Sequence, residues 1–220
     1  MVTSMHEPID ARITEQYEPY LSALLAGDRH TCQGVVEQLL ASGVAIRHLY
    51  VGLFQHSLYQ VGELWERNQI SVAKEHLATA ITESLLTLVY PVIFRTPRCG
   101  RRAVVSCVAN EHHQLGGKMV ADILELNGWD SYFLGANTPV NALLELIDEK
   151  QPELLCLSLS VYFNLPSLLN ALQQVHAAFP DLRILVGGQA FQWGRIAQVE
   201  DLDGVQIVQS IDALEQAIQL

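Results

Sequence analysis

The chain is short of basic residues. Lys and Arg number 13 against 24 Asp and Glu, which gives 220 residues a formal net charge of −11. A chain this acidic has no electrostatic attraction to a phosphate backbone, so direct binding to DNA or to an anionic membrane is not expected. Half of the residues are apolar, which is enough for a packed core and excludes wholesale disorder.

Cysteines are few, and their spacing includes no C-x-x-C pair. The four are Cys32, Cys99, Cys107 and Cys156. Cys107 and Cys156 fall within apolar, strand-like runs, where a thiol usually acts as a small hydrophobic side chain. The pattern argues against a disulfide framework and for a reducing compartment.

Long apolar runs and catalytic motifs are also lacking. The first 16 residues are polar, and no uninterrupted apolar run reaches the roughly 18 residues that a membrane span needs. We therefore expect a cytoplasmic protein. The sequence contains no nucleophile-elbow, P-loop or zinc-protease motif, so the chain is not expected to be an enzyme.

Residues 8–94 form the first predicted domain. Apolar residues recur there at spacings of three and four, in four runs, which predicts a four-helix bundle. Gly27 and Gly43 are expected to end helices. Ser71 is expected to cap the fourth helix, since its hydroxyl can accept from the free N–H groups of the first turn.

Residues 100–220 form the second predicted domain, after a basic Pro/Gly/Arg stretch at residues 95–102 that reads as a linker. Short apolar runs alternate there with amphipathic segments, which predicts a doubly wound, flavodoxin-like α/β fold with a parallel sheet. Five strands are expected within residues 102–109, 130–135, 153–160, 182–188 and 205–208.

Small and polar residues follow the predicted strands, where ligands bind in open α/β sheets. The first strand is followed by Glu111-x-His113-x-x-Gly116. A metal-ligating His commonly donates its other ring N–H to a carboxylate, so Glu111 is a candidate partner of His113. The third and fourth strands end in small residues that favour a groove along the backbone: Ser158, Ser160, Gly187 and Gly188.

These motifs, in this order, resemble the cobalamin-binding domain with the pattern D-x-H-x-x-G, a Ser-x-Leu/Thr strand end and a Gly-Gly pair. The resemblance implies that His113 is the lower axial ligand of cobalt and that Glu111 orients it. The groove for the nucleotide tail would be lined by Gly116, Ser158, Ser160, Gly187 and Gly188. Only His113 has glycine three residues later, which excludes His112. Glu replaces the commoner Asp, and the third strand ends in Ser-Leu-Ser.

The helical half carries a second motif, W-x9-E-H, formed by Trp65, Glu75 and His76. It resembles the cap bundle of the light-sensing, adenosylcobalamin-dependent repressors of carotenoid synthesis in the MerR-like group. The resemblance implies that these three residues contact the upper face of the corrin and the adenosyl group. Val72 lies one turn before His76 on the same helix face. Those repressors have a His directly after the Trp, where this chain has Glu66.

The repressors also carry an N-terminal DNA-reading domain, whereas this chain begins at the bundle and resembles the sensor half. We therefore expect a freestanding photosensor that binds adenosylcobalamin, or alternatively methylcobalamin. It would lose the upper ligand in light and signal to a regulatory protein partner, with a homo-oligomer as one form of the response. A corrinoid methyl carrier of a methyltransferase system is the main alternative. An interaction module without cofactor is a third. The cap residues favour the sensor, because a carrier must open its upper face.

Overall fold

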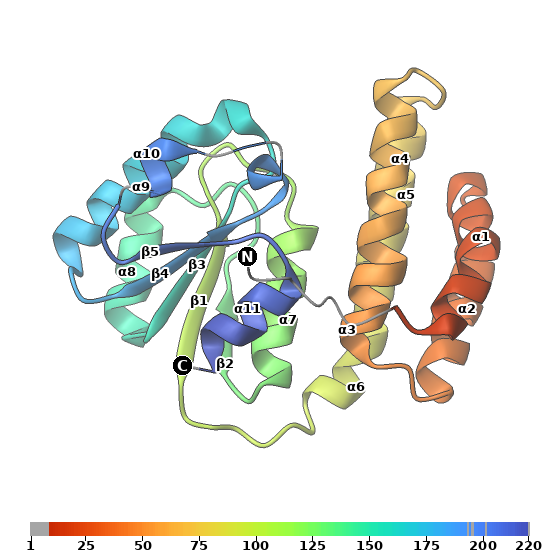
Figure 1. Ribbon diagram of the computed structural model, residues 1–220, viewed down its shortest axis with the longest axis horizontal. Coiled ribbons are helices and arrows are strands. Elements are labelled where there is room, and N and C mark those ends of the chain that lie inside the picture. Colours follow the sequence, from red (N-terminus) through yellow and green to blue (C-terminus); the bar gives the residue numbers. More distant parts are fainter. Residues whose placement is uncertain (1–8, 193, 195, 201, 220) are drawn as a thin grey trace, which may run out of the picture. The chain divides into compact units, whose positions relative to one another are not determined.

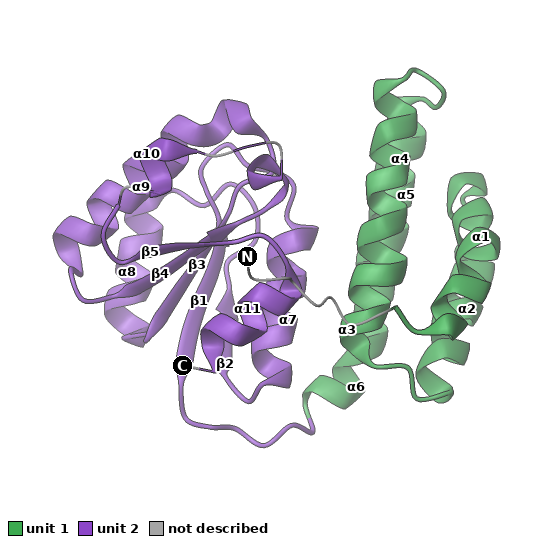
Figure 2. Ribbon diagram, viewed as in Figure 1, with its two compact units in different colours: residues 1–94 green, residues 95–220 purple. Residues whose placement is uncertain are grey.

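The computed structural model describes residues 9–192, 194, 196–200 and 202–219. The chain divides into two compact units, residues 1–94 and residues 95–220 (Figure 2). The first is helical and the second is α/β, so the predicted fold class is confirmed.

All four predicted helical runs of the first unit are helical (Figure 1). The third run is helical from Ile46 to Glu66, and its residues Leu49–Gln55 have π-helical hydrogen bonding. Ser71 caps the fourth run as predicted, because its side chain accepts from the backbone N–H of Lys74. The elements are α1 (Ala11–Ala26), α2 (Arg29–Ala41), α3 (Ile46–His48), η1 (Leu49–Gln55), α4 (His56–Glu66), α5 (Val72–Leu86), η2 (Thr87–Val89) and α6 (Tyr90–Ile93).

The core of this unit lies between α5 and the helices α1, α2 and α4, which it contacts. Tyr20, Tyr50 and Phe54 are among its largest fully buried side chains. The stretch Val72–Ile93 is long and apolar enough to cross a membrane, with a mean hydropathy of 1.3 in its most apolar window. That window is 39% buried, and Ala78, Ile81 and Leu85 of the stretch contribute to the core.

The second unit is built on a five-stranded parallel sheet with the strand order β2-β1-β3-β4-β5. From β1 the chain moves outward to β2, then returns to β3 and continues to the other edge. The order therefore reverses between β1 and β3, and ligands bind at such a point in open α/β sheets. The strands are β1 (Arg102–Cys107), β2 (Asp130–Phe133), β3 (Leu154–Ser158), β4 (Arg183–Gly187) and β5 (Val205–Val208).

Helices cover both faces of the sheet, as expected for a doubly wound fold (Figure 1). The first and last long helices, α7 and α11, contact each other on one face, and α8 contacts α9 on the other. β1 and β3 are buried almost throughout, which places the core on both sides of the central strands. The elements are α7 (Leu115–Leu126), α8 (Val140–Lys150), η3 (Tyr162–Asn164), α9 (Leu165–Ala178), η4 (Gln189–Phe191), α10 (Ala197–Glu200) and α11 (Ile211–Ile218).

Candidate functional site

The loop between β1 and α7 presents an imidazole to solvent. His113 lies two residues before α7, and its side chain is 63% exposed. Its ring atom Nδ1 lies 2.6 Å from Oε1 of Glu111, and its backbone N–H donates to the same oxygen at 3.0 Å. The Glu111 side chain is wholly buried. The loop therefore fixes one ring nitrogen against a buried carboxylate, while most of the side chain is exposed.

The second oxygen of Glu111 joins this loop to the end of β3. Oε2 accepts from the backbone N–H groups of Ser160 and Val161, each at 2.9 Å, and from Nδ2 of Asn164 at 3.3 Å. Asn164 also donates to the carbonyl oxygen of Asn110 at 3.1 Å. One buried carboxylate thus accepts from two loops that are about 50 residues apart in the sequence.

This hydrogen bonding keeps Glu111 ionised. Burial by itself raises the pKa of the carboxyl, but the imidazole of His113 and the N–H groups of Val161, His113 and Ser160 outweigh it and lower the pKa to about 2. An ionised carboxylate can only accept hydrogen bonds, so we assign the ring hydrogen of His113 to Nδ1. Its lone pair is then on Nε2, on the far side of the ring from the carboxylate. That is the tautomer a neutral imidazole needs to bind a metal through Nε2.

The geometry distinguishes the two adjacent histidines as the sequence spacing does. The bonds to Glu111 are made by His113, and His112 is exposed on the same loop. Among the described residues no group of three or more His, Cys, Asp and Glu side chains is placed to hold a metal ion.

The structure brings the remaining predicted groove residues to the end of the sheet at which the parallel strands terminate. Ser158, which is buried, pairs in register with Cys107 on one side and Gly187 on the other. Ser160 is half-buried and bonded through its backbone to Glu111. A β-carbon built on Gly116 would meet no atom within 4 Å, so there is open space in front of it.

The two later glycines have an explanation within the fold. A β-carbon on Gly187 would lie 2.6 Å from the carbonyl oxygen of Val208, and one on Gly188 would lie 2.3 Å from that of Leu159. Gly188 also has a φ of 114°, which side chains disfavour. Close backbone packing therefore requires glycine at both positions, and their contact with a cofactor stays a prediction.

The four predicted cap residues lie at one end of the α4–α5 hairpin. Trp65 is the next-to-last residue of α4 and is 46% exposed, and Val72 is the first residue of α5 and is also exposed. Glu75 is partly buried and bonds on both sides: Oε2 lies 2.6 Å from Nδ1 of His76, and Oε1 accepts from the hydroxyl of Thr79 at 3.0 Å. This end of the hairpin thus carries two exposed apolar side chains and a carboxylate of fixed orientation.

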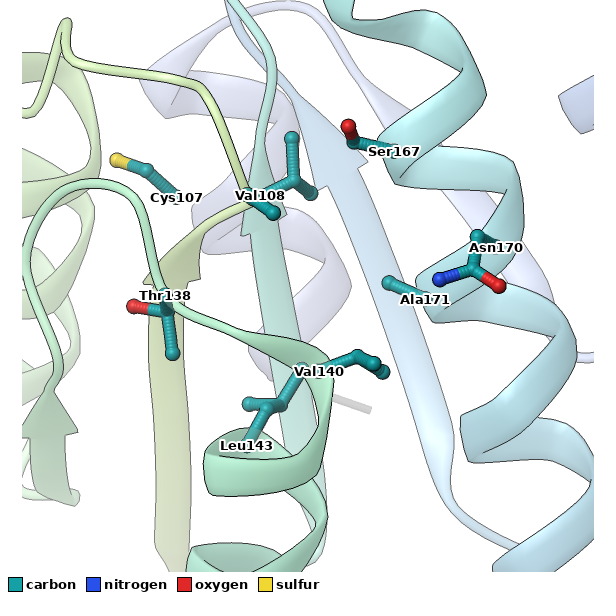
Figure 3. A pocket seen from close by; sticks show the side chains of 9 residues that line it. Cys107, Val108, Thr138, Val140, Leu143, Ser167, Asn170 and Ala171 are labelled. Atoms are coloured by element: carbon teal, nitrogen blue, oxygen red, sulfur yellow. The ribbon is translucent and has the colours of Figure 1, made fainter.

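A small cavity of about 60 Å³ lies beyond the end of β1, lined mainly by residues of α8, α9 and the loops before them (Figure 3). Thr138, Val140, Ser167 and Asn170 are among its lining residues. Its volume would hold one or two water molecules and is far too small for a corrin or a nucleotide. It is therefore not the candidate site.

Two contributors to the site were missed by sequence reasoning. Asn164 donates to Glu111 from a segment that carries no recognisable motif, and Thr79 orients Glu75 one turn along α5. The i, i+4 spacing of Glu75 and Thr79 is the one feature in the sequence that indicated such a contact.

Comparison with known proteins agrees with this geometry. The B12 binding domain family matches residues 101–217, and a second B12 binding domain family matches residues 16–90. The chain therefore belongs to the B12 binding domain family. The predicted resemblance to a cobalamin-binding protein is confirmed.

Two repressors from Myxococcus xanthus are similar in sequence. The HTH-type transcriptional repressor CarA is 37% identical over 91 residues, which are 41% of this chain and 31% of the repressor. The HTH-type transcriptional repressor CarH is 26% identical over 175 residues, 79% of this chain and 57% of the repressor. The chain thus spans 31% of the length of CarA and 57% of the length of CarH.

Among solved structures, the monomethylamine corrinoid protein of Methanosarcina barkeri matches with a TM-score of 0.81 and 14% identity. The match covers 94% of this chain and 98% of that protein. At this identity the likeness establishes a shared fold. The structure and the comparisons together support a cobalamin-binding protein.

Proposed function

We propose that this protein is a cobalamin photosensor. His113 would bind cobalt from below through Nε2, with Glu111 holding the ring and the edge formed by Gly116, Ser158 and Ser160 receiving the displaced nucleotide tail. The bound cofactor supplies a bond between cobalt and its upper ligand that light can break. Loss of the upper ligand would remove its contacts with the protein, which can shift the equilibrium between two conformations of the protein.

The exposed Trp65 and the fixed Glu75, both in the α4–α5 hairpin, are the observation that carries this proposal. Single exposed apolar residues are common, but this indole is at the same end of the hairpin as an exposed Val72 and a carboxylate oriented by His76 and Thr79. Such a surface suits a ligand that has both an apolar face and hydrogen-bonding groups, as an adenosyl group has. The similarity to CarA and CarH supports the same assignment. We therefore propose adenosylcobalamin as the physiological form, with methylcobalamin as the alternative.

A corrinoid methyl carrier is the second candidate. The fold shared with the monomethylamine corrinoid protein over nearly the whole chain favours it. A carrier must present the upper face of its cofactor to other active sites, and a tryptophan over that face would obstruct them. Preference for the adenosyl form over the methyl form therefore separates the two functions.

The output of the proposed sensor is a protein–protein signal. The net charge of −11 gives the chain no electrostatic attraction to DNA, so we propose a regulatory protein partner or a light-dependent homo-oligomer. We propose no catalytic activity for the chain and a cytoplasmic location.

Reconstitution with adenosylcobalamin in the dark tests the proposal. Absorption spectra and size-exclusion profiles are recorded before and after green light, with methylcobalamin in parallel. The sensor predicts tight, His-ligated binding of the adenosyl form and a light-dependent change in size or in partner binding. Equal affinity for both forms, with no change in either property on illumination, would favour the carrier.

A further inference from the structure

Three consecutive apolar side chains are exposed beginning at the third residue after β3. They are Val161, Tyr162 and Phe163, called here the 161–163 patch, and the last two are 58% and 88% exposed. Of the described residues in this unit, Leu202 is the one other large apolar residue that is exposed. Exposed aromatic side chains that adjoin one another commonly mark a binding surface.

The 161–163 patch is fixed to the loop that carries His113. Oε2 of Glu111 accepts from the backbone N–H of Val161 and from Nδ2 of Asn164. One oxygen thus bonds the first residue of the patch and the residue directly after the patch. The other oxygen holds the imidazole of His113. Since one carboxylate bonds both, the patch and the ring lie at the same edge of the sheet.

A flat macrocycle bound at Nε2 of His113 has to extend over the surface around the imidazole. The ring system of a corrin is apolar inside a rim of amide side chains, and the 161–163 patch has no charged side chain. Covering aromatic side chains with such a face removes apolar surface from water on both partners.

We propose that the 161–163 patch packs against the lower face of the corrin beside His113, with Tyr162 and Phe163 as the residues the ring covers. The inference rests on the proposed cobalamin site and adds binding residues to it. In this arrangement the patch contributes affinity and His113 contributes ligation. The two contributions can therefore be measured separately.

Phe163→Ala tests the patch, with Leu202→Ala as a matched control on an exposed apolar residue elsewhere in the unit. Each protein is titrated in the dark with methylcobalamin and followed by absorbance. Phe163→Ala is expected to weaken binding about 10-fold, because much of a phenylalanine's apolar contact is lost. Phe163→Leu should restore most of the affinity, and Leu202→Ala should bind as the unmutated protein does. The His-ligated spectrum should be unchanged in all of them.

A second measurement reports position directly. Hydroxyl-radical labelling with peptide mass spectrometry should modify Tyr162 and Phe163 in the cofactor-free protein and modify them much less when methylcobalamin is bound. Leu202 should be labelled equally in both states.

Unchanged affinity of Phe163→Ala, or unchanged labelling of the patch, overturns the inference. Loss of the His-ligated spectrum in Phe163→Ala also contradicts it, because the residue would then act through His113. If the unmutated protein binds no cobalamin, the proposed function itself fails. That result differs from the others because it is seen before any substitution is made.

Discussion

The imidazole of His113 is mostly exposed, yet it is held at 2.6 Å by the carboxylate of Glu111, which is wholly buried. A ring that is already oriented loses less freedom when it binds a ligand, which favours affinity. In the proposed site, the ring atom Nε2 binds the metal, and the bond from Nδ1 to Glu111 holds the ring in place.

His113→Ala should abolish the His-ligated spectrum of bound cobalamin, whereas His112→Ala should leave it intact. The reason is that the carboxylate fixes the ring of His113. Both variants are purified with adenosylcobalamin in the dark, and their spectra are compared. If His112→Ala alone removes the spectrum, the assignment of the lower ligand is wrong.

Glu111→Gln should lower the free energy of unfolding of the cofactor-free protein by about 2–4 kcal/mol. An amide has one acceptor oxygen, and its NH₂ group would face the backbone N–H donors that the carboxylate now satisfies. Urea denaturation measures the loss. The exposed Glu145→Gln is the control and should change stability by less than about 0.5 kcal/mol. Equal stability of the two variants would show that the buried carboxylate does not join the loops in solution.

Trp65→Ala should reduce the affinity for adenosylcobalamin about 10-fold and reduce the preference for the adenosyl form over the methyl form. Lower-face ligation should be unaffected, because Glu111 and His113 lie in the other unit. Titrations with both cofactors measure the selectivity. Phe94→Ala, which also removes an exposed aromatic ring from the helical unit, should bind both forms as the unmutated protein does. A preference that survives Trp65→Ala would exclude the indole from the upper face.

Glu66 is exposed at the last residue of α4, and a carboxylate there is a weaker ligand for low-spin cobalt than an imidazole. The illuminated protein should therefore lack a stable bis-imidazole spectrum, and Glu66→His should produce one. Spectra after green light and during return to darkness compare the two proteins. A bis-imidazole spectrum in the unmutated protein would require another histidine, such as His76, to move.

Thiol reactivity should distinguish Cys99 from the other cysteines. All four are free, and Cys99 is the exposed one. Burial raises the pKa of Cys32 to about 11 and those of Cys107 and Cys156 to about 12. A thiol with a raised pKa has little reactive thiolate at pH 8, and raising the pH should restore little reactivity until the protein unfolds. Ellman's reagent should modify one thiol quickly in the native protein and four in urea. Cys99→Ser should remove the fast reaction.

Much of the fold follows from local pattern. The five strands and the four helical runs are visible because apolar spacing changes from helical to strand-like at the linker. The Ser71 cap is visible because capping is a short-range effect. The local contact between Glu111 and His113 is likewise suggested by a spacing of two residues.

Other parts of the site depend on tertiary structure. Nothing in the sequence near Asn164 indicates that its amide reaches Glu111, because the contact forms only when β1 and β3 pair in their register. Likewise, the close approach of Gly188 to Leu159 is set by how β3 and β4 end, so the sequence did not show that packing requires a glycine there. The sequence pattern alone does not separate a packing role from contact with a cofactor, and that contact stays a prediction.

The π-helical segment Leu49–Gln55 sets the direction in which the end of α4 faces. A π turn contains one residue more than an α turn, and the wider turn takes up that residue, so later side chains keep nearly the direction that they would have after a regular α turn. If the segment closed into a regular α-helix with all of its residues kept, each residue no longer taken up in this way would turn Trp65 by about 100° around the axis. The segment therefore acts as an angular offset: the composition of α4 determines which side chain the hairpin presents, and the hydrogen bonding of the preceding stretch determines where that side chain points.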